Sequence, residues 1–257
     1  MSDEIRKKGF DRLFWVSYNL NRVKGGETLM KKIIGFIFAD DMEFKPFSDY
    51  AMGRGGEYIR KEPQNVIRLV SGDAEIYAIE SGVGKVNSAI AALDLIKSYN
   101  VDCIMSAGLS GAISALKKGD IVAGNSYVEC DFDIRAFGYP LGKKPNGQYI
   151  YGVPADMLEA ALKIEGVQQG RLGTGDFFLT DAVKKQEFKD EFSINAFDME
   201  SAAIAATCDR YGVPFMSIRK ISDDADDAAT ESYREMNNLC EVALTEILMA
   251  TVNNLVN

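Results

Sequence analysis

Short apolar runs alternate with segments of helical periodicity along the chain from residue 31 onward. This alternation predicts βα units built on a largely parallel sheet, and neither a linker nor an internal repeat divides them. We therefore expect a single α/β domain spanning residues 31–257. The expected strands are 32–39, 66–70, 75–81, 103–106, 121–128, 196–199 and 215–222. The expected helices are 43–52, 85–98, 155–163, 183–192, 200–211 and 232–255.

Residues 1–29 differ from the rest because they are basic and aromatic. One interpretation is an amphipathic extension that docks on a partner or a membrane. We favour a second interpretation, in which Lys24-Gly25-Gly26 is encoded by AAA-GGA-GGA, a ribosome-binding sequence placed upstream of Met30. Translation then starts at Met30, and residues 1–29 are an N-terminal extension produced by upstream read-through.

The composition excludes several kinds of chemistry. The chain has no histidine, which removes Ser-His-Asp and Cys-His catalysis and most zinc sites. Acid–base work must then come from Asp, Glu, Lys or Tyr. The formal net charge is −9 and no long basic run occurs, so we expect neither a nucleic-acid nor a membrane partner. We expect no metal and no cofactor.

Four cysteines stand at wide, irregular spacings that match neither a zinc site nor a small disulfide framework: Cys103, Cys130, Cys208 and Cys240. Buried reduced thiols are typical of a cytoplasmic protein, which is the location we expect. No apolar run reaches the roughly eighteen residues that span a bilayer. The run before Asp40 resembles the start of a signal peptide but lacks a cleavage site, so a buried first strand explains it better.

Two acidic segments carry the strongest functional signal. Asp198-Met199-Glu200 lies at a strand-to-helix junction, and Ser222-Asp223 ends the next strand. Ligands bind at such strand ends in α/β proteins, so a sugar-binding and a proton-donating carboxylate could share one pocket. The alternative is a helix N-cap followed by a solvated acidic loop.

Glycine-rich turns follow three of the expected strands, at residues 81–87, 106–112 and 173–179. Each permits close approach of the backbone to a ligand, although a plain structural turn explains any one of them equally well. Phe178 could stack on a heterocycle, or simply belong to the core. Glu43 could orient or deprotonate a water molecule, or lie on a solvated first helical turn.

These segments together resemble the 5′-methylthioadenosine/S-adenosylhomocysteine nucleosidases of the nucleoside phosphorylase family. The likeness covers residues 31–257 and includes, in order, Glu43, the 81–87 turn, Phe137-Gly138-Tyr139, Thr174-Gly175-Asp176, Asp198-Met199-Glu200 and Ser222-Asp223. The resemblance implies a three-layer α/β/α sandwich around a mixed, mostly parallel central sheet. It also implies a homodimer whose substrate is a purine nucleoside.

The resemblance further implies a role for each matching residue. Asp223 would protonate adenine N7 with Ser222 beside it, Glu200 would hold the ribose hydroxyls, and Glu43 would position the attacking water. Met199 would pack on the sugar, and Phe178 and Leu179 would hold the base. Ile134, Phe137 and Tyr233 would line the alkylthio pocket, some of them across the dimer interface. The remaining substrate-binding residues would be Ala39, Ser81, Gly82, Gly84 and Asp198.

The sequence departs from the family pattern at three places. The run Ser106-Ala107-Gly108-Leu109-Ser110-Gly111 replaces a Thr-Gly-Ser-Ala-Gly-Gly-like run, and Asp40 stands where many relatives have an apolar residue. Both bear on which 5′ substituent is accepted. Asp198 replaces a glutamate, which is a conservative change.

The expected chemistry is hydrolysis of an N-glycosidic bond. Asp223 must then hold a proton near neutral pH, which burial or the neighbouring Asp224, Asp226 and Asp227 would favour. The acidic loop after the first strand, and the lack of a basic residue at the end of the strand before Gly108, disfavour a phosphate site. The alternatives are a purine nucleoside phosphorylase and a non-catalytic nucleoside-binding or storage protein.

Overall fold

The computed structural model describes residues 31–145, 147–226, 229–231 and 241–256, without the side chains of 241–243. These residues belong to one compact unit, 31–257. The predictions made for residues 1–29, Tyr233, Asp227 and Cys240 lie outside the described residues.

The elements follow the predicted alternation. The strands are β1 (Lys32–Phe38), β2 (Glu57–Arg60), β3 (Val66–Ser71), β4 (Ala74–Glu80), β5 (Cys103–Ala112), β6 (Ile121–Glu129), β7 (Ile150–Gly152), β8 (Val167–Thr174), β9 (Ala196–Asp198) and β10 (Phe215–Asp223). The helices are α2 (Asp41–Met52), α3 (Lys85–Tyr99), α4 (Ala155–Leu162), α5 (Ala182–Phe192), α6 (Ser201–Tyr211) and α8 (Glu241–Val256), with a 3₁₀ turn η1 (Arg135–Phe137).

The strands form one mixed sheet whose order is β10-β6-β8-β9-β5-β1-β4-β3-β2. The parallel pairs join β1 to β4 and β5, β10 to β5, and β8 to β6 and β9. Because β10 pairs with both β5 and β6, the strands β5, β10, β6, β8 and β9 close into a ring. β5 therefore belongs both to this ring and to the open part of the sheet.

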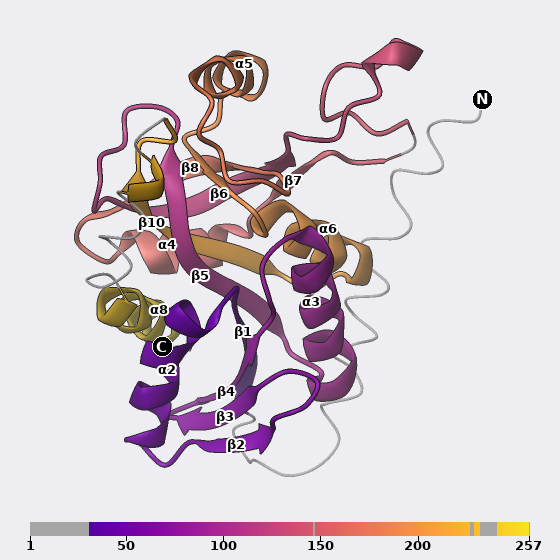
Figure 1. Ribbon diagram of the computed structural model, residues 1–257. Helices are drawn as coiled ribbons and strands as arrows, with labels where there is room; N and C mark the ends of the chain where they lie inside the picture. The colour runs from indigo at the N-terminus through magenta and orange to yellow at the C-terminus, as the bar shows by residue number, and fades with distance from the viewer. Residues whose placement is uncertain (1–30, 146, 227–228, 232–240, 257) are drawn as a thin grey trace. The chain divides into compact units, whose positions relative to one another are not determined.

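Helices cover both faces of the sheet, which confirms the three-layer prediction (Figure 1). One core forms where α2, α4 and α8 pack on the sheet, and it includes Phe47, Met157 and Leu248. The other forms beneath α3 and α6 and includes Leu95 and Ile204. All five of these side chains are buried, as the apolar positions of amphipathic helices require.

Two features of the sheet differ from the prediction. β5 continues to Ala112 rather than ending at Ser106, so the run Ser106–Gly111 is the interior of a strand and not a turn. Its residues are small because other side chains approach this strand closely, as Glu43 and Arg219 do at Gly108 and Asp223 does at Gly111. The strands β2, β7 and β8 were not predicted. In β8 the first half carries the exposed Gln168 and Gln169, so no apolar run marks it.

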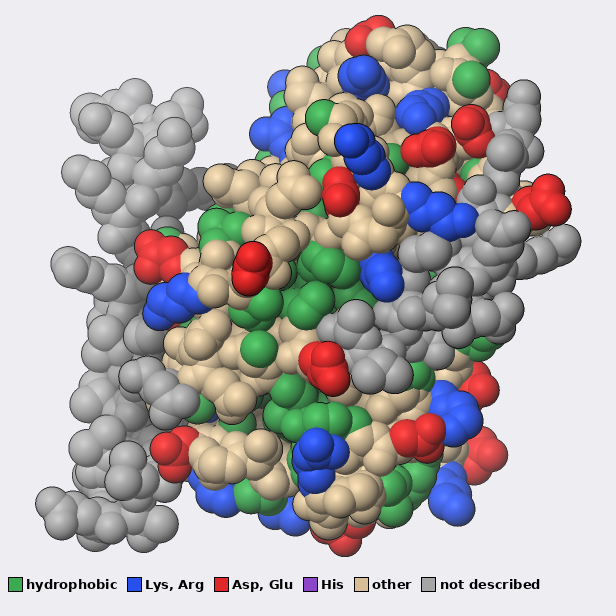
Figure 2. Space-filling view, turned by 90° about the vertical axis from the view of Figure 1, so that its left-hand side faces the viewer, with side chains coloured by type: hydrophobic (Ala, Val, Ile, Leu, Met, Phe, Trp, Pro, Cys, Tyr) green, Lys and Arg blue, Asp and Glu red, His purple; other side chains and the backbone are tan. Residues whose placement is uncertain are grey.

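The surface shown in Figure 2 carries Lys and Arg side chains interspersed with Asp and Glu, around hydrophobic side chains near its centre. This mixture is typical of an ordinary protein surface and differs from a single basic stripe. Over the residues that the structure describes, no helix combines the length and the apolarity needed to cross a membrane.

Candidate active site

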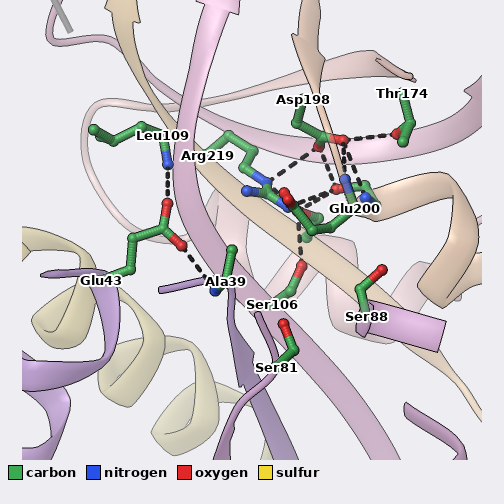
Figure 3. Close-up of polar contacts among 12 residues, drawn as sticks. Ala39, Glu43, Ser81, Ser88, Ser106, Leu109, Thr174, Asp198, Glu200 and Arg219 are labelled. Atoms are coloured by element: carbon green, nitrogen blue, oxygen red, sulfur yellow. Dashed lines mark hydrogen bonds and ion pairs between the residues drawn. The ribbon is translucent and has the colours of Figure 1, made fainter. Parts of the chain in front are cut away.

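Glu43 is held at the end of β1 by the start of α2. Asp40 caps this helix, since its Oδ1 accepts the Glu43 N–H at 2.9 Å. The Glu43 carboxylate in turn accepts the N–H of Ala39 at 3.0 Å and that of Leu109 at 2.9 Å (Figure 3). Burial raises the pKa of Glu43 to about 8, whereas the nearby Arg219 guanidinium lowers it. The helix cap thus fixes one carboxylate between the end of β1 and Leu109 in the interior of β5.

Arg219 on β10 is the charged centre of the site and is only 2% exposed. Its Nε lies 3.2 Å from Asp198 Oδ2, and its Nη2 lies 3.5 Å from Glu200 Oε2. Arg219 and Glu43 approach each other beside Gly108. A Cβ at this position would lie 2.4 Å from Glu43 Oε1 and 2.6 Å from Arg219 Nη1, so only the absence of a side chain leaves room for both. Burial would lower the pKa of Arg219, but the surrounding carboxylates raise it, so the guanidinium stays charged.

Asp198 at the end of β9 organises the start of α6. Its Oδ1 accepts hydrogen bonds from Thr174 Oγ1 at 2.7 Å, Glu200 N at 3.1 Å and Ser201 N at 3.0 Å. Its Oδ2 accepts from the Ser201 hydroxyl and faces Arg219. Through these contacts the side chain of Asp198 positions Glu200 and Arg219.

Glu200 follows at the helix start and is buried. Its Oε1 accepts the Gly84 N–H at 3.1 Å, in the turn where Gly84 adopts a φ of 94°. Burial raises the pKa of Glu200 above its ordinary value, and Arg219 opposes this rise. The turn before α3 therefore holds the carboxylate through its backbone. The neighbouring Lys85 N–H is also taken, by Asp176 Oδ1 at 2.8 Å.

Asp223 ends β10 and is held by its own loop. Ser222 Oγ donates to its Oδ2 at 2.5 Å, and the Ala225 N–H donates to its Oδ1 at 2.8 Å. Ala225 has a φ of 48°, which turns the chain back so that this donor reaches the carboxylate. Burial raises the pKa of Asp223, and the charges of Asp224 and Asp226 raise it further, while the two hydrogen bonds lower it.

These carboxylates face one pocket, which encloses about 570 Å³ including its open mouth. Nine of the residues predicted from the sequence line it: Ala39, Glu43, Phe178, Leu179, Asp198, Met199, Glu200, Ser222 and Asp223. Asp223 and Glu200 therefore lie in one cavity, as the sequence analysis required. The lining also includes Asp40, Val83, Leu109, Ser110, Gly111, Phe177, Phe197 and Ala225.

Some predicted residues lie outside this lining. Ser81 is buried, and its hydroxyl donates to the carbonyls of Phe38 and Gly82. Gly84 contributes through its bond to Glu200. Ile134 and Phe137 do not line the pocket of the single chain, and Phe137 is 80% exposed. Their role across a dimer interface stays a prediction.

Two groups of the site were not predicted from the sequence. Arg219 was quoted within its segment without a role, although an arginine inside a strand that ends at Asp223 is the signal that could have found it. The strand before Gly108 carries no basic residue at its end, but the neighbouring strand supplies one, since Arg219 pairs with Gly108 across β10 and β5. Ser110 was taken as part of a turn. Among the described residues, no group of three or more acidic or cysteine side chains is arranged to hold a metal ion.

Fold and site together define an α/β protein with a carboxylate-lined ligand pocket at its strand ends. The family model for the phosphorylase superfamily matches residues 33–253. The chain therefore belongs to the phosphorylase superfamily, and the resemblance stated from the sequence is confirmed.

Several relatives share more than the fold. A 5′-methylthioadenosine/S-adenosylhomocysteine nucleosidase of Halalkalibacterium halodurans is 36% identical over 70% of this chain and 81% of its own length. The nucleosidase of Bacillus subtilis is 30% identical over 70% of this chain and 82% of its own. The crystal structure of the Helicobacter pylori nucleosidase has a TM-score of 0.82 and 27% identity, covering 86% of this chain and 98% of that one.

We predict that Glu43→Gln changes how stability depends on pH. In the unfolded chain this carboxyl titrates near 4.5, but in the folded protein it keeps its proton until about pH 8. The folded state thus binds more protons between these values, so the contribution of Glu43 to the free energy of unfolding falls as pH rises. Between these two pH values the free energy of unfolding contributed by Glu43 falls by about 4–5 kcal/mol.

The variant lacks this titration, so its melting temperature should rise relative to wild type between pH 5 and pH 8. Glu246→Gln, at an exposed position on α8, is the matched control and should show no such trend. A melting-temperature difference for Glu43→Gln that stays constant with pH would contradict the assignment.

Proposed function

We propose that this protein hydrolyses the N-glycosidic bond of 5′-methylthioadenosine and/or S-adenosylhomocysteine, releasing adenine and a 5-thio-substituted ribose. The names of its relatives and the grouping of Asp223, Glu200 and Glu43 in one pocket support this activity. The nucleoside would span the pocket, with its base towards Asp223 and its sugar towards Glu200.

At the base end, Asp223 would donate a proton to adenine N7. Adenine is a poor leaving group as an anion, so protonation during bond cleavage lowers the barrier. The raised pKa of Asp223 favours the protonated form that this step needs. Phe178 and Leu179 supply the apolar and aromatic surface on which the purine would pack.

At the sugar end, positive charge develops on the ribose as the bond breaks. Glu200 would accept hydrogen bonds from the ribose hydroxyls and stabilise this charge. Glu43 would orient the attacking water and accept its proton, and its pKa of about 8 suits a base that works near neutral pH. Growing charge on the sugar favours the ionised form of both carboxyls.

The surroundings of Glu43 favour hydrolysis over phosphorolysis. The N–H groups of Ala39 and Leu109 would suit an anion, but both already donate to the Glu43 carboxylate. Arg219 lies nearby, yet Asp198 and Glu200 already pair with it. A phosphate dianion would therefore find these donors occupied and would be repelled by the acids that pair with Arg219, whereas a neutral water carries no charge to be repelled.

Phosphate dependence tests this choice directly. We expect adenine release from 5′-methylthioadenosine in phosphate-free buffer, with the free thio-sugar as second product and no gain when phosphate is added. Chromatography separates the free sugar from its 1-phosphate. A strict need for phosphate, with formation of the sugar 1-phosphate, would establish the phosphorylase alternative. Binding without any adenine release would favour the storage-protein alternative.

We predict that Asp223→Asn lowers kcat by roughly 10²- to 10⁴-fold, the range usual for a general acid. Asparagine keeps the size of the side chain and an acceptor for the Ala225 N–H, but it has no acidic proton to donate. Asp156→Asn, on the exposed first turn of α4, is the matched control and should keep wild-type rates. Equal adenine release by wild type and Asp223→Asn would refute the assignment.

We also propose that the chain forms a homodimer through α3. This helix exposes a stripe of apolar side chains at helical spacing, with Val86 69% and Ile90 54% exposed and Leu93 beside them. Exposed apolar stripes of this kind are typical of protein interfaces. Location in the cytoplasm likewise stays a prediction, supported by the buried free thiols of Cys103, Cys130 and Cys208.

Sedimentation equilibrium should give the wild-type protein twice the mass of one chain. Ile90→Asp should shift this equilibrium towards the monomer, because it places a charge in the apolar stripe. Val183→Asp, at an exposed apolar position on α5, is the matched control and should leave the mass unchanged. A monomeric wild-type protein would rule out the dimer.

A further inference from the structure

Ser110 on β5 has a buried hydroxyl that the protein does not satisfy. The residue is 4% exposed, and in the part of the chain that the structure describes its Oγ is the one buried side-chain polar atom without a hydrogen-bond partner. Buried polar groups are nearly always paired, because leaving one unpaired costs stability. This hydroxyl lines the pocket that holds Glu43, Glu200 and Asp223.

The other buried serines do not share this property. Ser106 donates to Ser217, Ser88 donates to the Lys85 carbonyl, and Ser222 donates to Asp223. On β5 itself, Ala107 and Ala112 are buried without a hydroxyl, so a small apolar residue suits this strand. Packing therefore does not account for the oxygen of Ser110.

The backbone on either side places Ser110 between the two ends of the site. The N–H of the preceding Leu109 holds Glu43. The following Gly111 lies against Asp223, since a Cβ there would be 2.9 Å from Asp223 Oδ1. The Ser110 carbonyl itself accepts the Ser222 hydroxyl at 3.3 Å. Ser110 is thus fixed between Glu43, which is proposed to position the water, and Asp223, which is proposed to protonate the base.

We propose that the Ser110 hydroxyl is a substrate-binding group that donates a hydrogen bond to the nucleoside where base and sugar join. The acceptors at that join are purine N3 and the ribose ring oxygen. This inference rests on the proposed function, because it takes the ligand to be a purine nucleoside. The ligand then satisfies the one buried oxygen that the protein leaves unpaired.

Ser110→Ala separates this role from a structural one. Because the Oγ is unpaired in the free protein, its removal should leave the melting temperature unchanged or raise it. Loss of one hydrogen bond to the ligand should lower kcat/KM for 5′-methylthioadenosine by roughly 3- to 30-fold. The affinity for 5′-methylthiotubercidin, which lacks N7 but keeps both acceptors, should fall by a similar factor.

Ser88→Ala is the matched control, because Ser88 is buried outside the pocket and its hydroxyl is paired. It should lower the melting temperature and leave the affinity for the analogue unchanged. If Ser110→Ala behaves like this control, losing stability but keeping wild-type affinity and kcat/KM, the proposal is overturned.

A substrate analogue with carbon in place of N3 identifies the acceptor. If Ser110→Ala and wild type cleave this analogue equally well, the bond goes to N3, and if the defect persists, it goes to the ribose. Binding of 5′-methylthiotubercidin needs no catalysis, so it tests the contact of Ser110 separately from the proposed hydrolysis. A wild-type protein that binds this analogue but releases no adenine from 5′-methylthioadenosine refutes the proposed function, while the effect of Ser110→Ala on analogue binding still tests the hydroxyl.

Discussion

The buried ion pairs of Arg219 are the interaction on which the pocket depends. Asp198 and Glu200 contact this guanidinium and Glu43 lies close to it, and each of the three carboxylates is buried. Like charges confined at such distances repel strongly unless an opposite charge lies between them. Removing one partner of a buried ion pair is far more destabilising than removing an exposed one. Arg219 therefore makes it possible for several acids to face one ligand.

Backbone groups at the strand ends complete this arrangement. Glu43 accepts from the end of β1 and from Leu109 within β5, and Glu200 accepts from the turn before α3. These backbone donors hold the two carboxylates in addition to the charge of Arg219. Fixed dipoles need little reorganisation when charge develops on a substrate, which is the condition for electrostatic catalysis. The same contacts fill donors that an anion would otherwise use, so they also influence which nucleophile can enter.

The sequence predicted most of the fold because the buried strands and helices have clear apolar periodicities. It failed where that signal is absent. β8 begins with exposed glutamines, and the run Ser106–Gly111 consists of small residues whether it forms a turn or a strand. The acids of the site were predicted from their places at strand ends. Arg219 was not, because its role depends on the pairing of β10 with β5, and pairing is a tertiary property. The unpaired state of Ser110 likewise depends on every neighbour that surrounds it.

Gly108 has a consequence for which variants this protein can tolerate. Glu43 and Arg219 approach each other through the volume that a side chain at this position would fill. Even a single methyl group would push them apart, whatever its polarity. Any larger residue at position 108 would therefore force Glu43 or Arg219 to shift, although Gly108 does not line the pocket and carries no reactive group. A mutational scan scored only by side-chain chemistry would overlook it.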